Sequence, residues 1–193
     1  MARANSLPLS WRGRWWDRIV TLSAVSEIVT RLEMTSPLQL VQGSPPPAPV
    51  QLQEVGAGSA HLVRSIYVRI WEPLVAAGRM TWSDDRWREE LSRPGVYSWV
   101  ARVGDEAAGF VELEGDANGD VGIVVFGLVP EFQGRRFGGS FLALATETAW
   151  RIGSLAGGPT QRVWLQTSSG DHPHALANYE RRGFRAFESR AGH

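Results

Sequence analysis

Hydrophobic positions recur at two different spacings along the chain, and the spacing predicts which segments are helices and which are strands. Between residues 61 and 71 the apolar residues repeat every three or four positions, which predicts an amphipathic helix packed on a sheet. Ser83, followed by Asp84 and Asp85, is typical of a helix N-cap, and this second helix should end near Leu91. Trp82 and Trp87 are spaced to pack together across that cap.

Alternation of apolar and polar residues predicts the strands. Tyr97–Val103 and Ala107–Glu114 both alternate and flank the turn Gly104-Asp105, which indicates a hairpin. Val121–Val129 is almost continuously apolar, as expected of a strand buried on both faces at the centre of the sheet. Further strands are expected at residues 27–34, 50–55, 162–166 and 184–187.

Two more helices and a connector complete the order of elements. Helices are predicted at 138–153 and at 175–182, where Gly183 gives the second helix its end. The Pro-rich segment 43–50 can be neither a helix interior nor a central strand. We therefore expect a mixed α/β fold in which residues 25–190 form one domain.

Residues 1–24 do not fit this alternating pattern. They combine Arg and Trp without the apolar core or cleavage site of a signal peptide, so we expect a disordered extension. The alternative is a helix lying in a membrane interface, using Trp and Arg side chains. The residues concerned are Trp11, Arg12, Arg14, Trp15, Trp16 and Arg18.

Composition narrows the classes of function. Twenty basic residues balance twenty acidic ones in 193 residues, so no overall field favours nucleic acid or an anionic membrane. No apolar run is long enough to span a membrane, and Cys is absent, which favours a reducing, cytoplasmic location. The four His lack the spacing of a metal site, so we expect no metal. Every basic residue is Arg, which suits phosphate contacts but is also what a codon bias produces.

The stretch 126–139, FGLVPEFQGRRFGG, carries the clearest chemistry. An apolar strand leads into a turn rich in Gly and Arg and then directly into an amphipathic helix. The N–H groups of the turn and the first helical turn have no intrahelical partner, and the helix dipole adds positive charge there. The pattern predicts an anion site, with a helix-capping turn carrying two solvated arginines as the alternative.

Two segments resemble the GNAT superfamily of acyl-CoA-dependent N-acyltransferases. VPEFQGRRFGG at 129–139 is similar to the family's pyrophosphate loop, and HALANYERRGF at 174–184 is similar to its closing helix. The two occur in the expected order on a strand, turn and helix, and together they cover about the last ninety residues. The resemblance implies a central, mostly antiparallel sheet splayed around acyl-CoA and flanked by helices.

The resemblance assigns the loop to the phosphates of acetyl-CoA. The residues concerned are Gln133, Gly134, Arg135, Arg136, Phe137, Gly138 and Gly139. Arg136 stands where the family usually has Gly, so the loop must accept a side chain there. Leu128 and Val129 lie where the family's central strand bulges and exposes backbone groups to the pantetheine arm, and Pro130 should end pairing at that point.

The resemblance also implies direct attack of an amine on the thioester, for which Tyr179 is the expected acid. The alternative is a tyrosine of the core, because Ala175, Leu176 and Tyr179 share one helical face. His172 and Asn178 are expected to contact the cofactor as well. His172 or His174 is a further candidate for the base, and a polar residue at the helix start is the alternative.

The base itself is not defined by the sequence. The family often has Glu where this chain has Gly122. Asp120, two residues upstream on the same strand face, is the expected substitute acting through a water, and a simple loop aspartate is the alternative. Glu112, Glu114 and Thr167 are the other candidates.

These observations predict an N-acetyltransferase that uses acetyl-CoA and a primary amine of a small molecule or a protein N-terminus. The alternatives are an acyl-CoA sensor without turnover and an interaction domain whose turn binds nothing. Apolar strand edges make a homodimer plausible. Trp71, Arg79 and Trp82 are expected to form the wall of the acceptor site.

Overall fold

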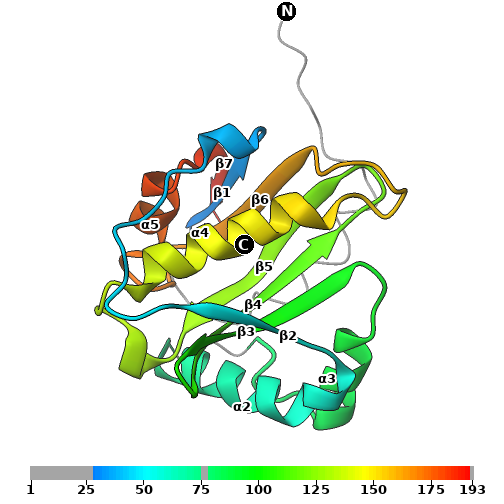
Figure 1. The fold of residues 1–193 in the computed structure, drawn as a ribbon, viewed down its shortest axis with the longest axis vertical. Helices are drawn as coiled ribbons and strands as arrows, with labels where there is room; N and C mark the ends of the chain where they lie inside the picture. The colour runs from blue at the N-terminus through cyan, green and yellow to red at the C-terminus, as the bar shows by residue number, and fades with distance from the viewer. Residues whose placement is uncertain (1–27, 75–77, 192–193) are drawn as a thin grey trace, which may run out of the picture.

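The computed structural model describes residues 28–74 and 78–191 of the chain. The expectations for residues 1–24 therefore lie outside the described residues. Figure 1 shows one sheet that runs through the described part, with helices packed on both of its faces.

The sheet has seven strands in the order β2-β3-β4-β5-β6-β1-β7. All neighbouring strands are antiparallel except β5 and β6, which are parallel. The strands span Ile28–Met34 (β1), Gln51–Val55 (β2), Val96–Val103 (β3), Glu106–Gly115 (β4), Asp120–Leu128 (β5), Arg162–Ser168 (β6) and Arg185–Ala191 (β7). The mixed α/β fold with a mostly antiparallel sheet is thus confirmed.

In the described part of the chain, two pairs of α-helices cover the sheet. The helices α2 (Ala60–Trp71) and α3 (Asp84–Leu91) pack on one face, and α4 (Phe137–Ile152) crosses the other face beside α5 (Ala175–Arg181) (Figure 1). Alternate residues of β4 point to opposite faces of the sheet. Phe110 belongs to the core under α2 and α3, whereas Val111 and Leu113 belong to the core under α4.

The α3 start has the capping chemistry expected from the sequence. Ser83 Oγ accepts a hydrogen bond from the Arg86 N–H at 3.2 Å, and the rings of Trp82 and Trp87 lie 5.2 Å apart. This cap fixes the direction in which the chain enters α3, and it brings Trp87 under the sheet, where the side chain is fully buried.

The first described strand pairs with the last two. β1 lies between β6 and β7, with Leu32 opposite both Leu165 and Ala186. The chain must then cross the molecule from this region to reach β2 at the far edge of the sheet (Figure 1). The crossing segment, residues 35–50, contains a 3₁₀ turn at Pro37–Gln39 and then runs without regular structure.

The crossing segment is fastened to α4 and α5 on its way. The Val41 N–H donates to the Arg182 carbonyl at 3.0 Å, and Ser140 Oγ donates to the Ser44 carbonyl at 3.3 Å. A Cβ on Gly183 would lie 1.9 Å from the Gln39 carbonyl oxygen, so only Gly allows this approach. The end of α5, the crossing segment and the first turn of α4 therefore form one packed unit.

Among the described helices, none combines the length and the apolar character needed to cross a membrane.

Candidate active site

The two parallel strands of the sheet separate along their length. β5 pairs with β6 only from Asp120 to Ile123, opposite Arg162 to Leu165, although both strands continue for several residues. Beyond Ile123 the side of β5 that faces β6 has no ladder partner among the described strands. An extended polar ligand can pair with backbone groups left in this way.

The bulge of the central strand lies closer to the middle of β5 than expected. Glu112 pairs with Val125 and Leu113 pairs with Ile123, which leaves Val124 as the extra residue. The expected bulge at Leu128 and Val129 is therefore wrong. Leu128 still pairs with β4, and Pro130 ends the strand without a bulge.

Backbone groups at the end of β5 already have partners. The Val129 N–H donates to the Ala108 carbonyl at 3.0 Å, and Gln133 Nε2 donates to the Leu128 carbonyl at 2.8 Å. The Gln133 side chain thus closes the loop onto the strand end.

The turn before α4 combines left-handed residues with an uncapped helix start. Gly134 and Arg136 both adopt left-handed backbone conformations, with φ of 68° and 67°. Arg136 is the N-cap of α4, and no side chain of the described residues caps the helix at this end. The N–H groups of the first turn, at Phe137, Gly138 and Gly139, therefore remain for an acceptor from outside the helix, where the helix dipole favours negative charge.

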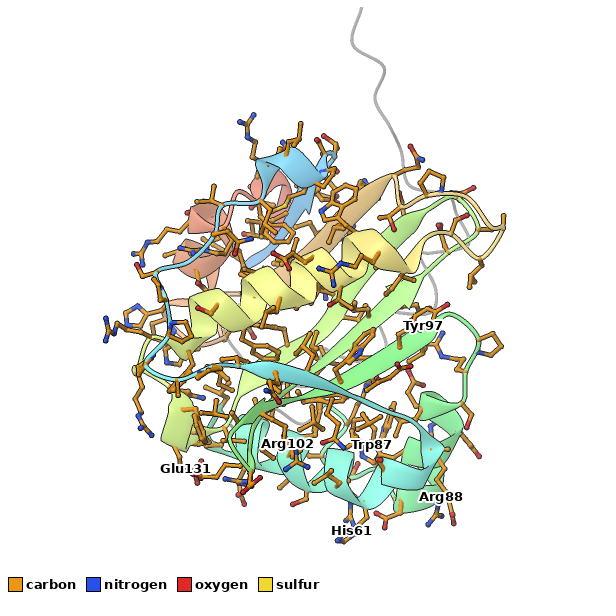
Figure 2. All side chains as sticks on the ribbon, viewed as in Figure 1. His61, Trp87, Arg88, Tyr97, Arg102 and Glu131 are labelled. Atoms are coloured by element: carbon orange, nitrogen blue, oxygen red, sulfur yellow. The ribbon has the colours of Figure 1, made fainter. Side chains whose placement is uncertain are left out.

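The loop arginines are exposed and extend the positive charge. The Arg135 guanidinium lies 5.6 Å from the Phe132 ring centre and 5.8 Å from that of Phe137, and it donates to the Glu131 carbonyl at 3.0 Å. Glu131, labelled in Figure 2, pairs with Arg69 of α2 at 3.1 Å rather than with a loop arginine. Glu131 thus does not neutralise the loop charge.

Tyr179 of α5 lies beside the separated part of β5. Its ring contacts Phe126 and Phe184 edge-on, with ring centres 6.3 and 6.4 Å away. Burial, with a smaller effect of Asp171, raises the pKa of its phenol above the usual value, so the group is protonated at neutral pH. The structure therefore brings a buried proton donor to the strand that leads into the anion loop.

Asn178 and His172 lie on two sides of the α5 start. Asn178 Nδ2 donates to the Gly138 carbonyl at 3.3 Å, which ties α5 to the first turn of α4. His172 Nδ1 accepts from the His174 N–H at 3.2 Å, and the two rings lie 5.4 Å apart. Asn178 thus borders the loop, while His172 lies in the turn that enters α5.

Asp120 lies at the closed end of the two strands. Its carboxylate pairs with Arg162 at 2.8 Å, and the same guanidinium pairs with Glu33 at 3.1 Å. Burial raises the pKa of Asp120, against the effect of Arg162. Eight residues of strand separate it from Leu128, about 26 Å at the usual rise. The structure does not bring Asp120 together with Tyr179 or the loop.

Gly122 has no room for a side chain. A Cβ built there would lie 2.8 Å from Cζ2 of Trp164, whose indole covers this point of β5. The position that the family often gives to Glu is therefore occupied by the ring of a residue on β6.

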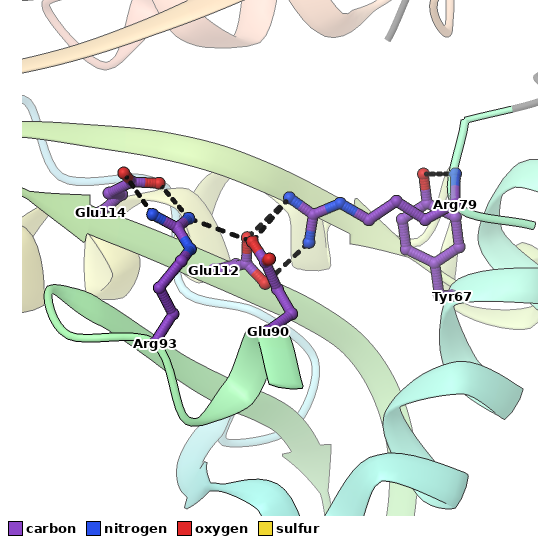
Figure 3. Close-up of polar contacts among 6 residues, drawn as sticks. All are labelled: Tyr67, Arg79, Glu90, Arg93, Glu112 and Glu114. Atoms are coloured by element: carbon purple, nitrogen blue, oxygen red, sulfur yellow. Dashed lines mark hydrogen bonds and ion pairs between the residues drawn. The ribbon is translucent and has the colours of Figure 1, made fainter. Parts of the chain in front are cut away.

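A cluster of buried charges lies under α2 and α3 (Figure 3). Arg79 Nη1 donates to Glu112 Oε2 at 2.9 Å, and Arg79 Nη2 lies 2.9 Å from Glu112 Oε1 and 3.6 Å from Glu90. Arg93 joins Glu90 at 3.1 Å and also binds Glu114. Burial raises the pKa of Glu112, and Arg79 opposes that shift.

The sequence analysis named Glu112, Glu114 and Arg79 without linking them, and it missed Glu90. Glu90 occupies an apolar position of α3, on the face of Trp87 and Leu91, and is itself only 3% exposed. A carboxylate at a position where the helical period requires an apolar residue was the signal for a buried ion pair.

Within residues 28–74 and 78–191, no group of three or more His, Cys, Asp or Glu is arranged to hold a metal ion. A depression of about 310 Å³ lies between the Pro37–Gln39 turn and the second half of α4, lined by Trp150 and Glu147 among others, away from the loop.

Comparison with protein families and solved structures identifies the fold. The family model described as the acetyltransferase (GNAT) family matches residues 61–184. Comparison with curated proteins found no match.

Three solved structures illustrate the similarity of fold. A GCN5-related N-acetyltransferase from Sphaerobacter thermophilus has a TM-score of 0.64 at 14% identity, covering 85% of this chain and 50% of its own. One from Kribbella flavida has a TM-score of 0.57 at 16% identity, covering 85% and 58%. An acetyltransferase from Thermus thermophilus has a TM-score of 0.55 at 16% identity, covering 76% and 99%. The chain thus spans only about half the length of the first two proteins.

Since the family model covers more than half of the sequence, the chain belongs to the acetyltransferase (GNAT) family.

Proposed function

We propose that this chain transfers an acetyl group from acetyl-CoA to a primary amine, by direct attack of the amine on the thioester. One observation carries the proposal. An uncapped helix start, preceded by two left-handed residues, follows the strand of the sheet that separates from its parallel neighbour. A ligand with a diphosphate and an extended polar arm matches both features.

The loop residues are assigned to the phosphates. The N–H groups of Phe137, Gly138 and Gly139 would bind the diphosphate oxygens, and Arg135 and Arg136 would add charge from the exposed side. Gly134 supplies the left-handed turn that aims the following N–H groups.

The arm of the ligand is assigned to the separated part of β5. Leu128 ends this edge, with its carbonyl occupied by Gln133, and Val129 supports it from the core. Asn178 and His172 would border the ligand at the α5 start.

Tyr179 is assigned as the acid for the leaving thiolate. Its buried phenol keeps its proton over the neutral and mildly alkaline range, so it can donate one hydrogen bond or one proton to a sulfur placed beside β5. The Phe ring contacts hold the phenol in one orientation.

No carboxylate is assigned as base. Asp120 is held by Arg162 at the closed end of the strands, and both oxygens of Glu112 face Arg79. We therefore propose that the amine reacts in its neutral form and loses its proton to solvent after attack. The acetylation rate should then follow the neutral fraction of the amine as the pH rises.

The second candidate is an acyl-CoA-binding module without turnover. The specific observation in its favour is Gly122, whose side-chain space is taken by Trp164. Such a module would bind acyl-CoA through the same loop residues as the enzyme, but it would form no acetylated product. The acceptor class, a homodimer and a cytoplasmic location stay predictions.

Calorimetric titration followed by a turnover assay tests the proposal. Acetyl-CoA should bind the wild type saturably, and the double variant Arg135→Ala, Arg136→Ala should bind at least about tenfold more weakly, because charge-assisted contacts are lost. A screen of amines then follows release of the free thiol of CoA. The chain contains no Cys, so every thiol detected comes from the ligand. Binding without thiol release would favour the module, and absence of binding would exclude both.

A further inference from the structure

We propose that Arg182, which the loop motif does not include, is a further binding residue for the phosphates of CoA. The inference rests on the proposed function, because it concerns the same site. Arg182 follows the last residue of α5, next to the first turn of α4.

The position of the guanidinium places a fixed cation beside the helix start. Arg182 Nη1 lies 3.5 Å from the point where a Cβ on Gly139 would stand, and Cζ lies 3.6 Å from it. Asn178 Oδ1 approaches the same point at 3.7 Å. Gly139 belongs to the first turn of α4, whose free N–H groups form the anion site.

The hydrogen-bonding groups of this guanidinium lack acceptors among the described residues. Nε and Nη1 of Arg182 are both buried without a hydrogen-bond partner there, and no described carboxylate pairs with the side chain. Burying such groups unpaired is unfavourable, because they lose their hydrogen bonds to water. A phosphate bound beside the first turn of α4 would supply the negative charge that the described residues do not provide.

The surrounding chain holds the side chain in place. The Arg182 carbonyl accepts from the Val41 N–H at 3.0 Å, and a Cβ on Gly43 would lie 2.6 Å from Nη1. The crossing segment thus passes directly over the guanidinium, and Ser44 continues onto Ser140 of α4. Because the charge is fixed before any ligand binds, little side-chain entropy is lost when a phosphate arrives.

The neighbouring arginine differs in the one respect that matters. Arg181 carries the same charge on the same helix but is exposed to solvent. Solvent screens the charge of Arg181. The charge of Arg182 is screened less, because its buried nitrogens lie within the protein beside the start of α4. Arg181 is therefore a matched control.

The test compares Arg182→Gln and Arg181→Gln by calorimetric titration with CoA, dephospho-CoA and pantetheine. Arg182→Gln should weaken CoA binding by at least about tenfold, whereas Arg181→Gln should change it less than about twofold. Loss for both nucleotides assigns Arg182 to the diphosphate, and loss for CoA alone assigns it to the 3′-phosphate. Pantetheine, which has no nucleotide phosphates, should bind all three proteins equally.

Each failure has a separate meaning. If the wild type does not bind CoA, the proposed function itself is overturned. If the wild type binds and Arg182→Gln binds equally well, or loses pantetheine to the same extent as CoA, Arg182 only holds the crossing segment and the inference is overturned. Arg182→Met, which keeps the aliphatic stem packed, gives the same comparison should Arg182→Gln fail to fold.

Discussion

Arginines occupy two regions of this domain in opposite electrostatic surroundings. Under α2 and α3, Arg79 and Arg93 are matched by the carboxylates of Glu90, Glu112 and Glu114. Around the α4 start, Arg135, Arg136 and Arg182 have no ion-pair partner among the described residues.

The two regions differ in whether carboxylates of the described residues compensate the arginine charge. Arg79 is 6% exposed and both of its terminal nitrogens face carboxylates, so its charge is already compensated and ties the α2–α3 region to β4. The positive charge at the α4 start adds to a helix dipole of the same sign, and under the proposed function the phosphates of the ligand compensate it. The two regions should therefore respond to substitution in different measurements, stability in the first and ligand affinity in the second.

Removing the buried carboxylate should give the largest effect. Glu112→Ala leaves Arg79 buried without its main partner, which costs about 3–5 kcal/mol of unfolding free energy in urea denaturation. The double variant Arg79→Met, Glu112→Leu removes both charges and should be clearly more stable than Glu112→Ala. If the loss in the double variant equalled the sum of the losses in Arg79→Met and Glu112→Leu measured singly, the pair would not be the compensated unit described here.

Tyr179→Phe should lower kcat by about a hundredfold, because general acid catalysis contributes about 10²–10⁴. The Phe ring keeps the contacts with Phe126 and Phe184, so urea denaturation should change little. A Phe variant with full turnover would show that Tyr179 serves only the core.

The same phenol gives a pH dependence with a definite sign. The pKa of Tyr179 is raised in the folded state, so its contribution to stability is complete below the unfolded-state value of about 10 and declines as the pH rises above it. Tyr67 is shifted in the same direction and adds to the decline. The unfolding free energy, measured by urea denaturation, should therefore fall less in Tyr179→Phe than in the wild type when the pH is raised from neutral to strongly alkaline.

Local patterns predicted most elements of the fold. The cap at Ser83, the hairpin turn at Gly104-Asp105 and the helix after the loop depend on neighbouring residues, and all three are confirmed. The position of β1 between β6 and β7 depends on pairing between segments at opposite ends of the domain sequence, and no local pattern encodes it.

The candidate site could be predicted only where it depends on neighbouring residues. The motif proposes the loop and Tyr179 as site residues, and both proposals follow from a short run of residues. It did not reveal that Val124 carries the bulge or that Arg182 lies against Gly139, because each results from the packing of separate segments. Asp120 was close in sequence to the expected base position, yet strand geometry places it far from the loop.

Gly122 lies in the first half of β5, which pairs with β6 and is covered by Trp164, unlike the separated second half. Substitution at Gly122 tests how tightly this paired half is packed. Gly122→Ala should cost about 1–3 kcal/mol in urea denaturation, since the new methyl group meets the indole. Gly115→Ala is the matched control, because its nearest contacts, at 3.7 to 3.9 Å, are ordinary. In a Trp164→Ala background most of the cost of Gly122→Ala should disappear, because only the contact with Val124 Cγ1 at 3.1 Å remains. An undiminished cost would show that the indole is not its cause.

The smallest expected effect concerns the loop backbone. Arg136 is a non-Gly residue at φ 67°, a conformation that costs about 1 kcal/mol with a side chain present. Arg136→Gly should therefore raise the unfolding free energy by about that amount while weakening CoA binding. Arg135→Gly should weaken CoA binding too, but it should lower stability, because the backbone at Arg135 is not left-handed and Gly only adds chain entropy there. The two variants would then change the unfolding free energy in opposite directions while both weaken CoA binding. That result would show that the loop accepts backbone strain at Arg136 to hold a charge where the anion binds. If Arg136→Gly left CoA affinity unchanged, the strain would have no such function and the charge of Arg136 would be incidental to the site.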